Sequence, residues 1–443
     1  MNQLSFLTCL AISATPFASI SRAPALPPML ETEDPFARFE LPGGVQLMVL
    51  HMADAPRQTT FTFLPLGLLH DDAEHAQYAH LVEHMLIRST DPNNLSAPGM
   101  TFNGETTGDA LRVETYAEVD HWEASLDRHL SWLDLEQVSA EVLEREKGRI
   151  AQEEASTVQG GYTHKWAEAA WNQVIRHGQS HAAVHANVES ATPTQLVDYA
   201  KRHLGQEGTV LIASVGPIDP VAIRAKLAEG LKNKAARFSA AGTREAANKK
   251  LASSAISAAT WDLDAHHMIV WTELPDRDAR DRVAGHALVQ LLNMELAKPG
   301  EFELGHLVTS TVSLPEGRYL MFSASLPNPE HADRARAVFE SALGQVLAGK
   351  SFPIPLALTQ LRAQASQGLD PEPARKQLKR MGRDTTLVEA QLLLTAVMNE
   401  LRLGLTFEET QAAWAALDLK QMESYLGHVR TSLKASSLVL SPK

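Results

Sequence analysis

Two distant stretches of the chain share one order of local signals, and this repeat constrains the fold more than any other feature. In the first, Thr192 precedes a proline and Gln195 lies three residues on, a pattern typical of a capped helix, and a strand is predicted over 210–215. In the second, Asp418 precedes another helix, and a strand is predicted over 437–440. Because helix followed by strand is common in α/β proteins, the pattern alone does not distinguish a duplicated unit from recurrence.

The length of the chain and a change in its composition near the middle are compatible with such a duplication. Its 443 residues correspond to about two to four domains of ordinary size. Regular structure is expected from Phe39, with strands over 45–50 and 59–66 and a helix over 76–87. The stretch 235–254 is rich in Ala, Ser, Lys and Asn, which favours a solvated linker over a core element.

Composition excludes several classes of protein. The single cysteine, Cys9, argues against a disulfide framework, a thiolate zinc cluster and a cysteine nucleophile. The formal net charge of −13 argues against nucleic acid as a partner, because the chain cannot neutralise a row of phosphates. An apolar content of 44% excludes a disordered chain. The sequence has no Gly-x-Ser-x-Gly elbow, so a serine hydrolase lacks its first requirement.

The N-terminal stretch Leu4–Ile20 is apolar, rich in small residues and followed by an Ala-containing cleavage pattern. It resembles a short secretory signal, although Asn2 and Gln3 stand where basic residues are usual. We therefore predict a signal peptide over 1–25 and export to the periplasm; if this segment is not a signal, the chain is cytoplasmic. Beyond it, no membrane span is expected, because no segment reaches the roughly 18 unbroken apolar residues that a membrane helix needs.

The pentapeptide His80-Leu81-Val82-Glu83-His84 carries the clearest chemical signal. Residues four apart on a helix share one face, so both imidazoles can reach one ion, with Glu83 beside the open coordination position. A hydrolytic zinc site needs these parts: protein ligands, one water, and a carboxylate that takes the proton of the water. The alternative is an amphipathic helix whose histidines are only polar-face residues, and the pentapeptide alone does not decide.

A charged stretch over 144–154 offers candidates for a third ligand. Glu146 and Glu153 are seven residues apart, which is two helical turns, so their side chains share one face. The ordinary explanation for such a run is a solvated helix with ion pairs between successive turns.

Together these segments resemble the pitrilysin-type inverzincin metallopeptidases, and more closely the mitochondrial-processing-peptidase-like branch. The resemblance covers Gly67-Leu68-Leu69 and the pentapeptide, then 103–106 and 144–153, and continues more faintly over 256–443. It implies an α/β fold, an α+β sandwich of two duplicated halves. Each half would be a mixed, mainly antiparallel sheet with helices packed on one face, forming half of a clamshell.

The resemblance also divides the chain. It implies an N-terminal metallopeptidase half over 26–237, a linker over 238–255 and a homologous C-terminal half over 256–443. The repeat of helix and strand fits this division, with the metal in the first copy only.

By resemblance, His80, His84 and Glu153 would hold one Zn²⁺ per chain. Zinc so held lowers the pKa of a bound water, and Glu83 would be the general base that takes its proton. Glu146 would orient a ligand histidine or tune its basicity. The ligand set carries a net charge of −1, so the site with zinc is positive overall and favours hydroxide.

The resemblance gives a further role to Asn103, Gly104, Glu105 and Thr106. They would form a strand edge against which an extended peptide substrate adds, with an ordinary surface strand as the alternative. His75 is not expected at the metal, because it is five residues from His80 and off its helical face.

The chain departs from the family where the second half supplies an Arg and a Tyr, seven residues apart, that grip substrate. Pro299 and His306 occupy the corresponding positions here, with Lys298 nearby. Arg318 and Tyr319 are adjacent, so they lie on opposite sides of a strand and do not substitute. We therefore expect a heterodimer in which a second homologous subunit supplies the Arg/Tyr pair.

Two functions of different classes stay open. The first is a zinc endopeptidase that hydrolyses unfolded or short peptides, and the second is a non-catalytic scaffold or processing-complex subunit of the same fold. The complete set of His80, Glu83, His84 and Glu153 favours the first, because a scaffold has no need of it. Metal binding without hydrolysis is a third.

Overall fold

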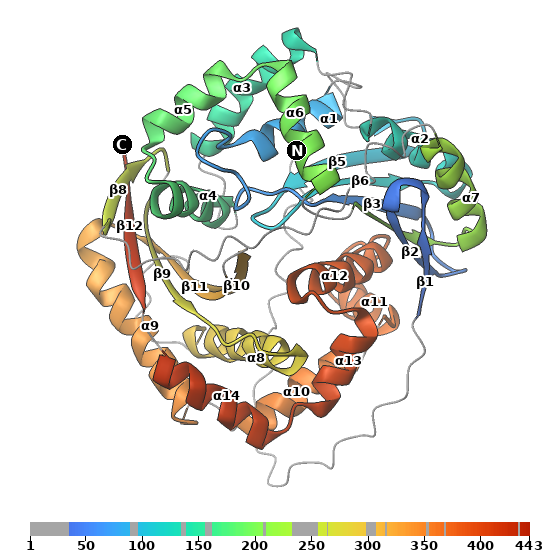
Figure 1. The fold of residues 1–443 in the computed structure, drawn as a ribbon. Coiled ribbons are helices and arrows are strands. Elements are labelled where there is room, and N and C mark those ends of the chain that lie inside the picture. Colours follow the sequence, from blue (N-terminus) through green and yellow to red (C-terminus); the bar gives the residue numbers. More distant parts are fainter. Residues whose placement is uncertain are drawn as a thin grey trace.

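The chain forms two α/β halves, each built around one sheet (Figure 1). The computed structural model describes residues 35–88, 96–133, 139–155, 162–206, 210–232, 256–263, 265–297, 307–314, 317–350, 354–366, 369–432 and 435–443. The predicted signal peptide, the whole of the predicted linker and the segment 298–306 lie outside the described residues, so the domain boundaries stay predictions.

The elements follow one another in a similar order in the two halves. The first half contains β1 (Phe36–Glu40), η1 (Pro42–Gly44), β2 (Gln46–His51), β3 (Gln58–Leu64), α1 (Tyr78–Arg88), β4 (Ser96–Ala97), β5 (Met100–Thr106), β6 (Leu111–Ala117), η2 (Val119–His121), α2 (Trp122–Trp132), α3 (Ala140–Ala155), α4 (Tyr162–Trp171), the π-helix η4 (Asn172–Arg176), α5 (His181–Ser190), α6 (Pro193–Gln206), β7 (Leu211–Gly216) and α7 (Pro220–Leu231). The second half contains β8 (Ala258–Trp261), β9 (His266–Glu273), α8 (Ala279–Leu296), β10 (Leu307–Leu314), β11 (Gly317–Leu326), η6 (Pro329–His331), α9 (Ala332–Leu347), α10 (Ile354–Ser366), α11 (Glu372–Arg380), α12 (Val388–Leu403), α13 (Phe407–Ala416), α14 (Leu419–Ser432) and β12 (Ser436–Pro442).

Five strands of the first sheet, β2-β7-β3-β6-β5, repeat the topology of the second sheet. The strand orders of the two sheets are β1-β2-β7-β3-β6-β5-β4 and β10-β11-β9-β12-β8. In each sheet the closing strand lies parallel to one neighbour, β7 to β2 and β12 to β8, and antiparallel to the other, β3 or β9. All other pairs are antiparallel. The predicted fold class, α/β with two duplicated halves of mixed, mainly antiparallel sheet, is confirmed.

The helices that lead into the closing strands begin with the same reciprocal cap. At α6 the Thr192 N–H donates to Gln195 Oε1 at 2.9 Å, and the Gln195 N–H donates to Thr192 Oγ1 at 3.3 Å. Asp418 and Gln421 make the equivalent pair at α14, with distances of 2.9 and 2.7 Å. Each cap satisfies backbone donors that the first turn of a helix leaves unpaired. The predicted helix starts are confirmed.

The local signals also locate β2, β3 and α1 to within two residues of the predicted ranges. The predicted start of regular structure at Phe39 is wrong, because β1 begins at Phe36. Phe36 pairs with Leu50 of β2, and its ring packs edge-on against Phe407 of the second half at 5.6 Å between centroids. That distant ring gives no signal in the neighbouring sequence.

The first sheet is buried on both faces. The helices α1, α2, α6 and α7 of its own half form a core against one face. Phe61 and Phe63 point to the other face, where they pack against Leu393 and Val397 of α12 from the second half. Figure 1 shows α12 lying beneath this sheet, on the side away from the helices of the first half.

The second sheet receives the reciprocal cover. Its own helices, including α8, α9 and α14, pack on one face. Trp271 and Met321 point to the other face, against α4 and η4 of the first half. The rings of Trp171 and Trp271 meet edge-on there, with 5.6 Å between centroids. The two halves therefore exchange helices: α12 of the second half covers one face of the first sheet, and α4 of the first half covers one face of the second sheet.

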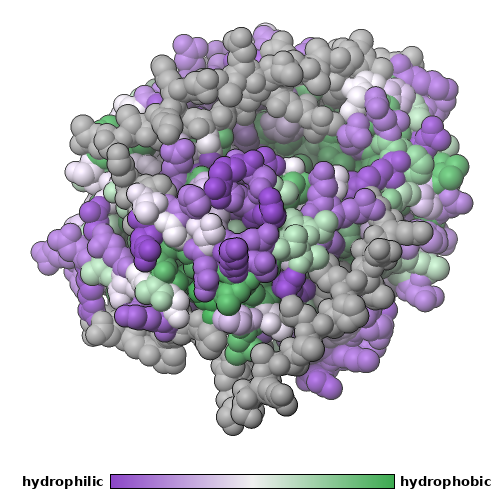
Figure 2. Space-filling model, turned by 60° about the horizontal axis from the view of Figure 1, so that its bottom comes forward, coloured by the Kyte–Doolittle hydropathy of each residue, from purple (hydrophilic) through white to green (hydrophobic). Residues whose placement is uncertain are grey.

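The apolar side chains of the described residues are largely gathered in these cores. Figure 2 shows one face of the molecule, on which apolar patches alternate with hydrophilic residues. The large apolar residues that are exposed are few and scattered: Val221, Ile256, Met381, Leu401 and Leu419. Among the helices of the described ranges, none has the length and apolar character to cross a membrane.

Because α12 of the second half covers the sheet of the first, we expect the two halves to unfold together. Leu393 is fully buried, so Leu393→Ala should lower the free energy of unfolding by about 3 kcal/mol. Leu401 on the same helix is 40% exposed, so Leu401→Ala should change it by less than about 0.5 kcal/mol. Urea denaturation followed by circular dichroism and by tryptophan fluorescence should give one coincident transition. Two separate transitions, only one of them shifted by Leu393→Ala, would contradict the mutual cover.

Candidate metal centre

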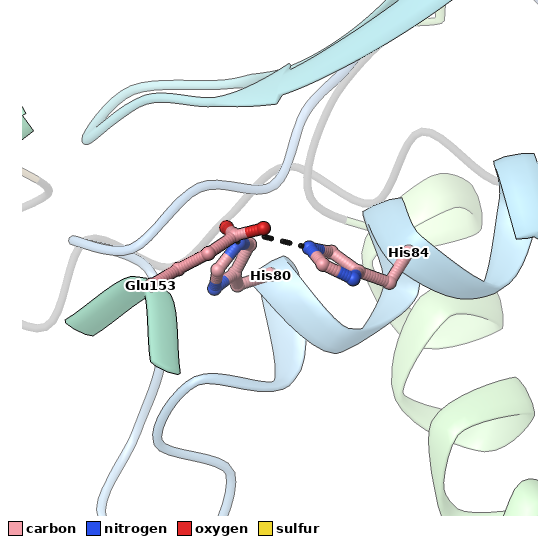
Figure 3. A group of neighbouring side chains, drawn as sticks. All are labelled: His80, His84 and Glu153. Carbon is pink, nitrogen blue, oxygen red and sulfur yellow. Dashed lines mark ion pairs between the residues drawn. The ribbon is translucent and has the colours of Figure 1, made fainter. Parts of the chain in front are cut away.

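His80 and His84 lie one turn apart on α1 and turn their rings to the same side (Figure 3). Their ring centroids are 4.7 Å apart, and both side chains are buried. The helix packs between the first sheet and α3, and all its residues except Arg88 are buried. A buried helix of this kind fixes the direction of both imidazoles.

Glu153 reaches the two histidines from near the end of α3 (Figure 3). Its Oε2 atom lies 3.3 Å from His80 Nε2 and 3.6 Å from His84 Nε2. One ligand atom from each residue lies within 4.8 Å of those of the other two, and within the described ranges this is the only such group of His, Cys, Asp or Glu. The Glu153 side chain is half exposed, so the group opens to solvent on this side.

Glu146 holds His84 from behind. His84 Nδ1 donates to Glu146 Oε2 at 3.0 Å, which leaves Nε2 facing Glu153. The Glu146 carboxylate is fully buried and also accepts from Arg145 Nε at 3.1 Å and from Arg149 Nη1 at 2.8 Å. The predicted orienting contact of Glu146 with a histidine is therefore present. A carboxylate in this position fixes the tautomer of an imidazole ligand.

Glu83 lies on α1 between the two histidines and faces β5. Thr106 Oγ1 donates to Glu83 Oε2 at 2.8 Å. At Gly104, a Cβ atom would lie 2.4 Å from Ile87 Cδ1 and 2.9 Å from Glu83 Cγ, so a larger residue here would displace the side chains of α1 that face the strand. The Thr106 contact was not part of the sequence prediction, which gave Thr106 to substrate.

The predicted substrate edge divides in the structure. Thr106 is fully buried behind Glu83, whereas Asn103, Gly104 and Glu105 are half-buried. Glu105 accepts from Arg112 Nη2 at 2.7 Å, across the β5–β6 pair. In the described part of the chain, β4 pairs only with the first two residues of β5.

Trp166 of α4 is a residue that the sequence gave no means of finding. Its ring packs against His80, with 4.9 Å between centroids. It belongs to the helix that covers the second sheet, so its place beside His80 depends on packing between the halves. No motif or periodicity near Trp166 indicates this contact.

The other candidates lie where the sequence placed them. His75 Nδ1 donates to Asp72 Oδ1 at 2.7 Å, and His75 is not part of the group around His80. Tyr319 belongs to the core between β11 and α4, whereas the neighbouring Leu320 belongs to the core on the helix side. Side chains alternate along a strand, so Arg318 and Tyr319 point to opposite faces, as predicted.

The carboxylates set the protonation of the centre. Burial alone would lower the pKa of His84, but Glu146 and Glu153 beside its two nitrogens raise that pKa from 6.5 to about 9. Burial would raise the pKa of Glu153, but the two imidazoles hold it well below its usual range. The pKa of Glu146 is also lowered despite burial, chiefly by His84. In the metal-free chain at neutral pH, His84 is protonated and both carboxylates are ionised.

Helix α8, the counterpart of α1 in the second half, carries no equivalent ligands. Helix α8 follows β9 as α1 follows β3, and it reads Ala-Leu-Val-Gln-Leu over 287–291 where α1 reads His-Leu-Val-Glu-His. Ala287 and Leu291 are buried in the core of the second half. The duplicated helix therefore keeps its packing role without metal-ligating side chains.

Solved structures share this fold. A protease from Helicobacter pylori is 12% identical with a TM-score of 0.62, over 92% of this chain and 99% of that chain. An inactive domain of an M16 peptidase from Pseudomonas fluorescens is 13% identical with a TM-score of 0.60, over 92% and 98%. The periplasmic protease PqqL from Escherichia coli is 15% identical with a TM-score of 0.56, over 94% of this chain and 48% of that chain.

At these identities the likeness shows the fold alone, which the chain shares with proteases and with an M16 inactive domain. No protein-family model matches the sequence, and no curated protein matches it.

The protonation of His84 predicts a pH dependence. A divalent metal that binds His84 must displace its proton, so the apparent affinity for zinc should fall about tenfold for each pH unit below 9. At pH 7, zinc binding should release about one proton from His84, measured by calorimetry in two buffers of different ionisation enthalpy. Glu146→Gln should release fewer protons at pH 8, because it removes one carboxylate that raises the pKa. Affinity that does not change between pH 6 and 9 would contradict this account.

Proposed function

We propose that this chain is a zinc-dependent endopeptidase that hydrolyses unfolded or short peptides. The observation that carries the proposal is the convergence of His80, His84 and Glu153, with Glu83 beside them on the same helix. The fold shared with solved proteases supports a peptidase. We further propose that the chain is the metal-bearing subunit of a pair like the mitochondrial processing peptidases.

The donor set fits one zinc ion per chain. Ligands about 2.0–2.1 Å from a tetrahedral zinc lie roughly 3.4 Å from one another. Glu153 Oε2 lies at 3.3 and 3.6 Å from the two imidazole nitrogens, which agrees with this spacing. Two histidines and one carboxylate leave a fourth position for water, as hydrolytic zinc sites require.

When bound by His80, His84 and Glu153, zinc would supply Lewis acidity and bring the pKa of a bound water toward neutrality. Glu83 would take the proton of that water and pass it to the leaving amine. Thr106 holds Glu83 Oε2, which leaves Oε1 to receive the proton. Glu146 would keep His84 Nε2 directed at the ion, and Trp166 would keep water from the back of His80.

The edge of β5 is proposed as the place where substrate adds. Asn103, Gly104 and Glu105 follow the part of the strand that β4 covers in the described chain, and they lie within one strand of Glu83. An extended peptide could pair with this edge through its main chain, which suits unfolded substrates of varied sequence.

A scaffold subunit is the second candidate function. It is favoured by one specific observation, the likeness to an inactive M16 domain of nearly the same length. The presence of Glu83 and of all three ligand side chains favours the enzyme, because a scaffold needs none of them.

A partner subunit follows from what the second half lacks. The residues at the positions of the expected Arg/Tyr pair, Pro299 and His306, lie outside the described chain, and neither is Arg or Tyr. The present chain matches about half of PqqL, so a second unit beside it has a parallel in that protease. Export to the periplasm, through the segment 1–25, belongs to the same proposal.

Glu83→Gln tests the enzyme directly. The amide keeps the shape and the Thr106 contact but cannot take a proton, so cleavage of a quenched fluorescent peptide should fall by about 10²–10⁴-fold. Zinc content, measured by atomic emission, should stay at one ion per chain. Gln290→Ala, at the matching position of α8, is the control and should cleave as the wild type does. Equal rates in wild type and Glu83→Gln would refute the role of Glu83.

The partner requirement has its own test. The purified chain, loaded with zinc, should bind the metal stoichiometrically but cleave peptides poorly, because it carries no Arg/Tyr pair at the expected positions. Sedimentation velocity should establish which assembly is present in the same samples. Full turnover by an isolated monomer or homodimer would refute the proposal that a partner subunit is needed.

A further inference from the structure

The start of α1 is unusual because a ligand histidine sits in its first turn. His80 is the third residue of the helix, and the N–H groups of a first turn have no acceptor within the helix itself. Gln77, directly before the helix, has φ of +68°, and within the described ranges it is the only non-glycine residue with positive φ. This backbone conformation is unfavourable for a side-chain-bearing residue and needs support from its surroundings.

The side chain of Asp71 provides that support from six residues upstream. Its Oδ2 accepts from the Gln77 N–H at 2.8 Å, and its Oδ1 accepts from the Ala79 N–H at 3.2 Å. Asp71 is buried, so these contacts are shielded from competing water. The carboxyl group of Asp71 therefore holds both the strained residue before α1 and the residue next to His80.

Asp71 is itself fixed from two sides. Tyr199 Oη, on α6, donates to Asp71 Oδ1 at 2.6 Å, and its side chain is fully buried. Asn172 Nδ2, on η4, donates to the carbonyl oxygen of Asp71 at 3.2 Å and to that of Leu68 at 3.1 Å. Neither the carboxyl group of Asp71 nor its backbone can shift without breaking one of these bonds.

We propose that Asp71, fixed by Tyr199, is a positioning residue that sets the first turn of α1 and so aims His80 at the metal. The inference rests on the proposed zinc site and adds to it a hydrogen-bonded link, from Tyr199 through Asp71 to the backbone beside His80. The link acts through geometry. Without it the first turn of α1 opens, and His80 no longer points at the metal. His84 lies a turn further on and keeps its contact with Glu146.

The second half provides an internal comparison. Tyr425 stands on α14, which precedes β12 as α6 precedes β7, and it is buried like Tyr199. Its hydroxyl has no hydrogen-bond partner among the described residues. Helix α8, which bears no metal ligands, is capped by the adjacent Asp278, whose carboxylate accepts from the N–H groups of Arg280 and Asp281. The remote cap accompanies only the helix with the histidines.

The test compares Asp71→Asn, Tyr199→Phe and Tyr425→Phe in the full chain. Zinc affinity is measured by competition with a chelator, and the unfolding midpoint in urea is measured on each metal-free variant. Asp71→Asn should weaken zinc binding by about 10- to 100-fold, because the amide offers one acceptor oxygen where two are used. Tyr199→Phe should weaken it by about three- to tenfold. Tyr425→Phe should bind zinc as the wild type does.

Cobalt provides a second readout that a merely structural role would not move. The visible bands of Co²⁺ in Asp71→Asn and Tyr199→Phe should differ from those of wild type, because His80 is displaced as a ligand. If Asp71→Asn does not fold, Tyr199→Phe decides. Variants that bind zinc within twofold of wild type, with unchanged cobalt bands, would overturn the inference even if their unfolding midpoints fell. Failure of the wild type to bind zinc would instead refute the proposed function.

Discussion

The fold depends on one requirement, that apolar side chains cover each sheet on both of its faces. Phe61 and Leu64 point to opposite faces of β3, and both are buried. Burial of one such side chain stabilises the fold by about 1.5–3 kcal/mol, whereas a partly exposed ion pair such as Arg38–Glu400 between the halves contributes roughly 0–1 kcal/mol. The exchange of α4 and α12 therefore holds the halves together more strongly than their polar contacts do.

The candidate metal centre lies beside this exchange. Trp166 packs against His80, and the helix that carries it also covers the second sheet. The turn before α1 is held by Asn172 of η4, whose neighbour Trp171 packs against Trp271. The second half contributes no side chain to this group from the described residues, yet its sheet supports helix α4, whose Trp166 packs against His80.

The sequence predicts those parts of this arrangement that depend on short spacings. His80 and His84 share a helical face because they are four residues apart, and the caps at Thr192 and Asp418 are equally local. Glu153 came from resemblance, since only the packing of α1 against α3 brings it to the histidines. The Thr106–Glu83 and Tyr199–Asp71 contacts span 23 and 128 residues, and neither has a periodicity that could reveal it. The exchanged helices escaped prediction because an apolar helix face does not specify which sheet it covers.

The position of α12 in the chain has a consequence for biosynthesis. The strands of the first sheet are complete once β7 has been made, but α12, which covers its outer face, begins only at Val388. During synthesis Phe61 and Phe63 therefore stay uncovered until almost nine-tenths of the 443 residues have emerged. An apolar sheet face exposed for that long invites association with other chains. We therefore expect a chaperone to bind the nascent chain before its last helices are synthesised.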